Sequence, residues 1–219
     1  WSSFQAVNKL KWKIRRELGI KTIKIGHAGA LDPLATGLLL VCVGKATKRI
    51  EELQAGEKTY TGTIVLGATT PCYDLERPVD AYYPTRHLTP SLIEETIREQ
   101  FLGEIAQVPP MFSAIKLAGQ RAYEYARDGE PVHIEPKRVV IHEFALTALR
   151  GLEQPQELLG QPLPQPFPDA QTQLYRQAQP FPHELPQVDF RIRCGKGTYI
   201  RSLARDLGLA LGTGAFLSA

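Results

Sequence analysis

A single acidic residue, Asp32, lies in a glycine-rich and apolar stretch that runs from residue 26 to 39 and reads GHAGALDPLATGLL. Pro33 biases Asp32 toward an extended backbone, and the glycines permit backbone angles that other residues avoid. Such a loop would present one carboxylate in a fixed position. An ionised carboxylate can attack a carbon covalently or stabilise positive charge that develops on it. A structural interpretation stays open, because Asp followed by Pro is also a good N-cap and first residue of a helix.

Two residues elsewhere in the chain could complete such a site. Tyr60 has Gly62 beside it on the same face of a predicted strand, and the gap could admit a flat ligand, although a glycine bulge is the commoner explanation. Arg201 falls in the first turn of a predicted helix, where the helix dipole disfavours a cation. An anionic partner is therefore expected, and Asp32 is one candidate, whereas a solvent-exposed arginine would need none.

Hydrophobic periodicity predicts the elements that position these residues. Residues 3–18 are predicted to form an amphipathic helix, with a capping box at Ser2. The apolar run 38–43 predicts a buried strand beneath the Asp32 loop. The remaining predicted elements are strands over 58–66, 139–149 and 188–194, an extended segment over 108–116, and helices over 90–101, 121–127 and from 200 onward. The apolar face of the first helix would carry Phe4, Val7, Leu10, Ile14 and Leu18.

Composition is that of an ordinary globular protein, with 43% hydrophobic and 22% charged residues. No apolar run approaches the roughly 18 residues that cross a membrane, and the opening residues are basic and helical in pattern, unlike a signal peptide. The three cysteines are widely spaced, which argues against a disulfide framework or a zinc site and favours a reducing, cytoplasmic environment. We expect a single α+β domain over residues 1–219, with a Pro/Gln-rich surface insertion at 151–187.

Positive charge is concentrated near the start of the chain. The net charge is +3 and the pI is about 8.7, which alone does not indicate a nucleic-acid ligand. Between residues 9 and 24, Glu17 is the only acidic residue. A phosphate-binding face and a solvated helix surface are equally compatible with this pattern. The cations are Lys9, Lys11, Lys13, Arg15, Arg16, Lys21 and Lys24.

Together these motifs resemble the TruB family of pseudouridine synthases, which convert the uridine at position 55, in the TΨC loop of tRNA, to pseudouridine. The stretch 26–37 resembles that family's catalytic motif, G-H-[TS]-G-[TA]-L-D-P-x-A-T-G. The resemblance covers nearly the whole chain except 151–187. It extends to GKATK at 44–48, KTY at 58–60, PMFSAIK at 110–116, YEYAR at 123–127 and GTYIRS at 197–202.

The resemblance implies a role for each matched residue. Asp32 would be the catalytic aspartate, and Arg201 would form the salt bridge that holds it. Tyr60 would stack on the target uracil and take part in proton transfer, while Tyr199 would line the pocket. The RNA-binding residues would be His27, which enters the RNA loop, and more weakly Lys45, Lys58, Lys116 and the basic N-terminal helix.

The resemblance also implies the pseudouridine synthase fold, a mixed and largely antiparallel sheet flanked by helices and loops. The reaction would need no cofactor or metal, and the expected partner is the T-arm stem-loop of tRNA, bound by a monomer without a protein partner or membrane. Arg201→Ala would then lower the reaction rate more than it lowers the stability of the fold. Two other functions stay open: the catalytic subunit of an RNA-guided pseudouridylation complex, and a tRNA-binding or tRNA-folding module.

The chain departs from the family pattern at a few places. Ala28 stands where the family has threonine or serine, and Pro71 replaces the first aspartate of a T-D-T-x-D pattern at 70–74. Family members begin with a strand and a K-P-x-G turn ahead of the position of Trp1, and bacterial ones often add a C-terminal PUA domain. We therefore expect a catalytic domain trimmed at both ends, without a PUA domain.

Overall fold

The structure is a computed structural model that describes all residues except 114, 118–119, 123–124, 126–132, 153–184 and 219. The chain forms two compact units, Trp1–Glu57 and Lys58–Ala219. Two predictions, the helix at 121–127 and the insertion at 151–187, fall largely outside the described residues. Within the described part of the chain, no helix has the length and apolar character needed to cross a membrane.

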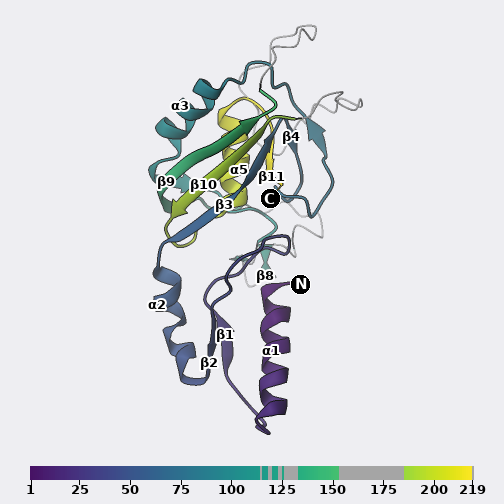
Figure 1. The fold of residues 1–219 in the computed structure, drawn as a ribbon, viewed down its shortest axis with the longest axis vertical. Coiled ribbons are helices and arrows are strands. Elements are labelled where there is room, and N and C mark those ends of the chain that lie inside the picture. The colour runs from purple at the N-terminus through teal and green to yellow at the C-terminus, as the bar shows by residue number, and fades with distance from the viewer. Residues whose placement is uncertain (114, 118–119, 123–124, 126–132, 153–184, 219) are drawn as a thin grey trace. The chain divides into compact units, whose positions relative to one another are not determined.

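The first unit consists of a long helix beside a short pair of strands (Figure 1). Helix α1 (Ser3–Glu17) begins at Ser2, whose side chain accepts a hydrogen bond from the backbone of Gln5, while the Gln5 side chain accepts one from the Ser2 backbone. The predicted capping box is therefore confirmed. Strands β1 (Ile25–His27) and β2 (Val41–Val43) pair antiparallel, and the 3-10 helix η1 (Gly44–Arg49) leads into α2 (Ile50–Ala55).

The apolar run before β2 is not the predicted buried strand. Only Val41–Val43 is extended and paired, and Leu38 is 82% exposed. One backbone bond, from Ala28 to the carbonyl of Leu40 (2.9 Å), continues the pairing beyond β2. Gly37 has a φ of +147°, which turns the chain where a strand would have to continue. The Asp32 loop therefore rests on a two-stranded ladder of three residue pairs.

The predicted apolar face of α1 is also wrong in part. Val7 is buried, but Phe4 and Leu18 are each 67% exposed and Leu10 is 37% exposed. Within the helix, only Ser3 and Val7 are buried. Periodicity identified the helix correctly, but it overestimated how much apolar surface the first unit covers.

The second unit is built on a five-stranded sheet in the order β11-β3-β10-β9-β6, with every neighbouring pair antiparallel. These strands are β3 (Lys58–Leu66), β6 (Gly103–Gln107), β9 (Lys137–Arg150), β10 (Gln187–Cys194) and β11 (Ala215–Leu217). Two small pairs accompany it, β4 (Ala68–Thr69) with β5 (Ala81–Tyr82) and β7 (Lys116–Leu117) with β8 (Gln120–Arg121).

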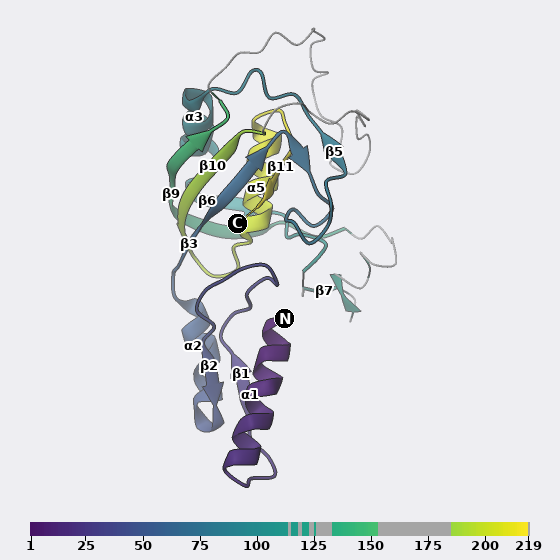
Figure 2. The same ribbon diagram turned by 45° about the vertical axis from the view of Figure 1, so that its right-hand side comes forward.

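The main core packs between this sheet and two helices, which are drawn beside the sheet in Figures 1 and 2. In β10 the residues Val188, Phe190 and Ile192 are buried and alternate with charged residues, as the sequence predicts for a half-buried strand. Helix α3 (Pro90–Gln100) starts at Thr89 as predicted, and helix α5 (Ile200–Ala210) packs beside it. Leu203 and Leu207 of α5 are fully buried in the same hydrophobic cluster.

Three local predictions for the second unit need correction. The β3–β10 register runs unbroken through Gly62, so no bulge lies there in that pair; the irregularities fall in the β10–β9 pair. The segment 108–116 is interrupted by a bend at 111–113, where the Ser113 amide donates to the Met111 carbonyl (2.8 Å), and it pairs as a strand only from Lys116. Strand β6, at one edge of the sheet, was not predicted, since GEIAQ carries little apolar alternation.

Candidate active site

Asp32 lies in a backbone turn within the loop that joins β1 to β2. Its carbonyl accepts a hydrogen bond from the amide of Ala35 (3.0 Å), and the chain folds as a turn at Pro33 instead of starting a helix. The N-cap interpretation is therefore wrong. The Asp-Pro pair closes a tight turn, which fixes the backbone that carries the carboxylate. Asp32 itself is exposed.

The buried hydroxyl of Ser3 holds this loop against the start of α1. Its oxygen accepts a hydrogen bond from the amide of Leu31 (2.9 Å) and donates one to the Leu31 carbonyl (3.2 Å). Ser3 is 8% exposed, and Leu31 directly precedes Asp32. Both backbone polar groups of Leu31 are thus satisfied by one side chain, which sets the position of the next residue.

Ser3→Ala is expected to loosen this loop. The Leu31 amide loses its partner, which costs about 1–3 kcal/mol of stability. If Asp32 is the catalytic carboxylate that the sequence predicts, its displacement also lowers the rate of the catalysed reaction, by roughly tenfold or more. Thermal unfolding and single-turnover rates measure the two effects. Ser3→Thr keeps the hydroxyl and should restore the rate; equal rates for Ser3→Ala and wild type would show that this contact does not position Asp32.

The other candidates of the first unit flank the same ladder. His27 ends β1, and its Nδ1 lies 2.7 Å from the carbonyl of Gly29. Because a carbonyl can only accept, Nδ1 carries the proton and donates it there, which fixes the ring. Lys45 is exposed on η1. A Cβ at Gly26, in β1, would lie 2.9 Å from the tip of the Ile50 side chain, which would have to shift.

In the second unit, the N-terminus of α5 is fixed by a buried glutamine. Tyr199 is the N-cap residue of α5. Its amide donates to Oε1 of Gln107 (2.8 Å), and its carbonyl accepts from Nε2 of the same side chain (3.1 Å). Gln107 is 1% exposed and ends β6. Sequence analysis missed Gln107, because its only sequence signal is a polar residue at the end of a weak strand.

Arg201 is a buried cation in the first turn of α5, 6% exposed. Its Nε lies 3.6 Å from a carboxylate oxygen of Asp74, whose side chain is 9% exposed. The guanidinium also donates to the carbonyls of Cys72 (3.1 Å) and Phe112 (3.0 Å). The expectation of an anionic partner near this helix start is thus met by Asp74. The pairing of Arg201 with Asp32 stays a prediction.

The segment 70–74 is shaped to supply these contacts. The hydroxyl of Thr70 donates to the carbonyl of Asp74 (2.7 Å), and Tyr73 adopts a φ of +61°, which is rare for residues other than glycine. Arg205 lies over the Tyr73 ring at 5.1 Å from its centroid. Burial raises the pKa of the Cys72 thiol, so this cysteine is no thiolate nucleophile. Asp74 was missed as a site residue, although the loose T-x-x-x-D pattern at 70–74 was its sequence signal.

The remaining candidates of this unit lie on strands. Tyr60 is in β3, opposite Ile192 of β10, and packs partly buried against the main core cluster. Lys58 begins the same strand, opposite Cys194. Lys116 begins β7. The second unit therefore supports Tyr60, Tyr199 and Arg201 from one sheet and one helix, while Asp32, His27 and Lys45 belong to the first unit.

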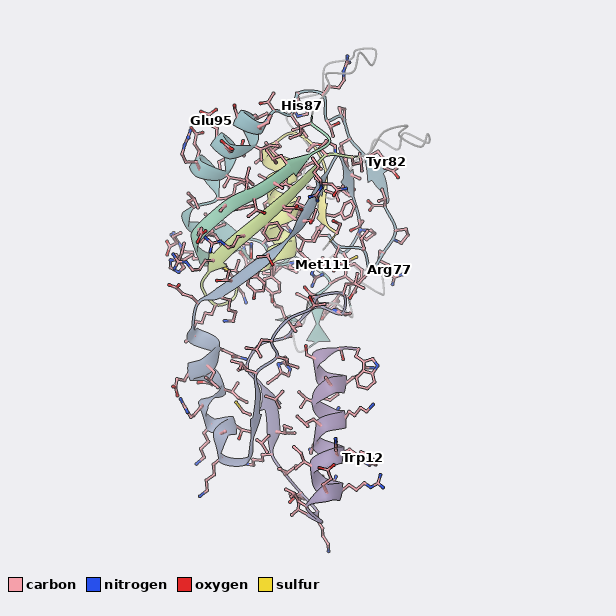
Figure 3. The ribbon with its side chains drawn as sticks, viewed as in Figure 1. Trp12, Arg77, Tyr82, His87, Glu95 and Met111 are labelled. Atoms are coloured by element: carbon pink, nitrogen blue, oxygen red, sulfur yellow. The ribbon has the colours of Figure 1, made fainter. Side chains whose placement is uncertain are left out.

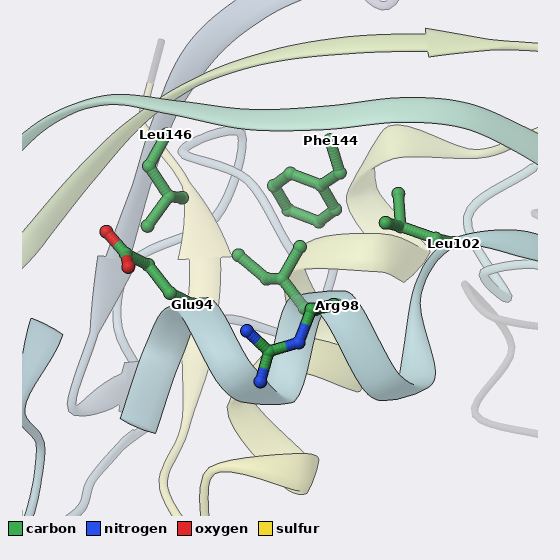
Figure 4. Close-up of a pocket in the computed structure, with 6 residues that line it drawn as sticks. Glu94, Arg98, Leu102, Phe144 and Leu146 are labelled. Carbon is green, nitrogen blue, oxygen red and sulfur yellow. The ribbon is translucent and has the colours of Figure 1, made fainter. Parts of the chain in front are cut away.

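A pocket of about 240 Å³ in the second unit contains none of the predicted site residues. It lies between α3 and β9, and Figure 4 shows Arg98 of α3 and Phe144 and Leu146 of β9 along it. Among the described residues, no group of three or more histidine, cysteine or acidic side chains is placed to hold a metal ion.

Comparison with known proteins identifies the family. The model of the TruB family pseudouridylate synthase (N terminal domain) matches residues 15–156. A tRNA pseudouridine synthase B of Flavobacterium johnsoniae is 50% identical over 219 residues, which is 100% of this chain and 80% of that protein. The protein of the same name from Phocaeicola vulgatus is 46% identical over 218 residues, which is 100% of this chain and 78% of that protein.

Solved structures agree on the fold. A chain in the crystal structure of a Cbf5-Nop10-Gar1 complex superposes with a TM-score of 0.55 at 24% identity, covering 100% of this chain and 43% of that one. This supports the α+β pseudouridine synthase fold, with the difference that the sheets described here are antiparallel throughout. Because the family model matches more than half of the chain and full-length relatives reach 46–50% identity, the chain belongs to the TruB family of pseudouridylate synthases, which are isomerases.

Proposed function

We propose that this protein converts a uridine of the TΨC loop of tRNA to pseudouridine, with Asp32 as the catalytic carboxylate. The relatives named tRNA pseudouridine synthase B support tRNA as the substrate. The observation that carries the assignment of Asp32 is its fixed loop, in which Ser3 satisfies both polar groups of Leu31 and a turn closes on Asp32 itself. Preorganised charge of this kind is effective in catalysis because it needs no rearrangement during the reaction.

The proposed reaction breaks the N1–C1′ bond of uridine, rotates the detached uracil, and forms a C5–C1′ bond. The proton leaves C5 and N1 gains one, so the atoms balance without an external group. The uracil must leave the stacked loop before its atoms can be reached. Asp32 then acts by covalent attack or by stabilising positive charge at C1′, and Tyr60 supplies an aromatic surface for the extruded base, worth about 1–3 kcal/mol.

Arg201 and His27 complete the proposed site. In the proposed complex the Arg201 guanidinium, already fixed by Asp74 and two carbonyls, orients the Asp32 carboxylate. His27, whose ring is fixed through Nδ1, enters the RNA loop in place of the flipped uridine. Contacts to phosphates and to loop shape, rather than to sequence, then select the RNA.

The test is the activity of the purified protein on a bare T-arm stem-loop labelled with tritium at C5 of uridine. We expect tritium release and a single pseudouridine in the TΨC loop, located by sequencing. The assay contains no guide RNA and no accessory protein, so product formation excludes dependence on either. Binding without any tritium release would instead support a tRNA-binding or tRNA-folding module, and release that requires a guide RNA would support the RNA-guided alternative.

A further inference from the structure

Strand β6 ends in a buried polar side chain. Gln107 is the one buried residue of this strand, and it is 1% exposed. Burial of an amide lowers stability unless its polar atoms are bonded, and an apolar side chain of similar size would be buried at lower cost. Both ends of the Gln107 amide bond to Tyr199, through the Tyr199 amide (2.8 Å) and the Tyr199 carbonyl (3.1 Å). The reason for a glutamine at this position therefore lies at Tyr199.

These two bonds fix the direction of the Tyr199 side chain. The amide and the carbonyl of a residue lie on either side of its Cα atom, so holding both groups gives the Cα–Cβ bond one direction. Tyr199 has an extended backbone, with a φ of −103° and a ψ of 111°, and it is half-buried. A fully buried side chain from a different element thus orients a tyrosine that is partly open to solvent.

The end of β6 and the start of α5 exchange contacts. A glutamine three residues after the N-cap of a helix commonly bonds to the N-cap amide. In α5 that position is Ser202, whose hydroxyl donates to the carbonyl of Val108 instead (2.8 Å). Gln107, which precedes Val108 in the chain, makes the bond to the N-cap amide from β6. Each element therefore holds the backbone of the other, and the two are fixed as one piece.

The segment after β6 reaches the same helix a second time. The chain continues past Met111, which is labelled in Figure 3, to Phe112, whose carbonyl accepts from the Arg201 guanidinium (3.0 Å). Arg201 also contacts Asp74, so its position has support besides the start of α5. The backbone of Tyr199, in contrast, is tied to β6 through Gln107. Loss of Gln107 should therefore disturb Tyr199 more than Arg201.

We infer that Gln107 is a positioning residue, which orients the Tyr199 ring toward the extruded uracil. This inference rests on the proposed function, because it gives Gln107 a part in the same reaction through the tyrosine that the family resemblance places in the pocket. A fixed ring limits the positions open to the detached uracil while it rotates, and a displaced ring lowers the rate of bond formation. RNA affinity depends mainly on phosphates and loop shape, so it is little affected.

The first test replaces Gln107 with methionine, which has a similar size and makes neither bond. The single-turnover rate of tritium release should fall about tenfold to a hundredfold. The Kd for a labelled stem-loop, measured by fluorescence anisotropy, should stay within about threefold of wild type. Thr89→Ala is the matched control, because it removes the hydroxyl that accepts from the Leu92 amide (3.1 Å) at the start of α3. It also lowers stability, but it should react at the wild-type rate.

A conservative variant tests whether the two bonds are what matters. In Gln107→Glu, burial favours the neutral carboxyl, which can accept from the Tyr199 amide and donate to the Tyr199 carbonyl. Its rate relative to wild type should therefore rise as the pH falls from about 8 to about 6. The same comparison serves if Gln107→Met does not fold. A ratio that stays constant with pH would contradict the inference.

A double variant tests whether Gln107 acts through Tyr199. If it does, Gln107→Met/Tyr199→Ala should react as slowly as Tyr199→Ala alone, because the ring to be oriented is already gone. A loss equal to the product of the two single losses would show that Gln107 acts elsewhere, for example through Arg201, and would overturn the inference.

A spectroscopic measurement separates this inference from the proposed function. In protein labelled with 3-fluorotyrosine, the fluorine resonance that Tyr199→Phe removes belongs to Tyr199. It should shift or broaden in Gln107→Met and stay unchanged in Thr89→Ala. If wild-type protein forms pseudouridine while Gln107→Met keeps the full rate or an unchanged resonance, only the inference fails. If wild-type protein releases no tritium, the proposed function fails, and a displaced resonance would still show that Gln107 orients Tyr199.

Discussion

Replacing Asp32 with asparagine is expected to abolish pseudouridine formation and to leave RNA affinity within about threefold of wild type. Asparagine has nearly the same shape, but it carries no negative charge and is a poor nucleophile, so both proposed roles of the carboxylate are lost. The expected fall in single-turnover rate is at least roughly a thousandfold. Tritium release from labelled stem-loop RNA measures the rate, and anisotropy measures affinity.

The loop itself should survive this substitution. Ser3 bonds to Leu31, and Ala35 bonds to the main-chain carbonyl of Asp32, so neither contact uses the carboxylate. Glu51→Gln is the matched control, because it removes one exposed carboxylate from α2 of the same unit. A wild-type rate in Asp32→Asn would disprove the catalytic assignment, and a comparable loss in Glu51→Gln would show that the effect is only one of net charge.

Replacing Arg201 with alanine is expected to lower the free energy of unfolding by about 3–5 kcal/mol. The side chain is 7% exposed, and its removal leaves the buried Asp74 carboxylate without this partner and the carbonyls of Cys72 and Phe112 without this donor. Denaturant unfolding of the variant measures the loss. The resemblance predicts mainly a loss of rate, whereas the burial of this network predicts a large loss of stability as well.

A matched control and a conservative variant separate the loss of stability from the loss of reaction rate. Arg98→Ala breaks an ion pair with Glu95 whose side chains are 68% and 57% exposed, and it should cost at most about 1 kcal/mol. Arg201→Lys keeps a charge beside Asp74 but loses the fork that reaches two carbonyls, so it should regain much of the stability while staying slow. Full activity in Arg201→Lys would show that Arg201 is structural only.

Much of the local structure follows from the sequence alone. The capping box at Ser2, the N-cap at Thr89 and the alternation in β10 are each decided by neighbours within a few residues, so their signals are legible in one chain. The motif around Asp32 is equally local, and five ordered motifs were enough to indicate the family that the comparisons establish. The mutual arrangement of the predicted site residues remains a prediction.

Other features depend on contacts between distant residues. The loop that carries Asp32 is held by Ser3, which lies 28 residues from Leu31, whose amide and carbonyl it bonds. The N-terminus of α5 is set by Gln107, 92 residues from Tyr199. Neither partner has a local pattern that reveals its role, because a buried serine or glutamine is recognised only by the backbone groups that it satisfies.

The sequence by itself therefore predicted the candidate site residues and determined most of the elements that carry them. Only the tertiary structure decided that Arg201 is buried against Asp74, that β6 completes the sheet, and that Trp12 faces outward. The physical reason is that burial and pairing are properties of the assembled fold. Helical periodicity specifies which residues share a face, but only packing determines whether that face meets the core or the solvent.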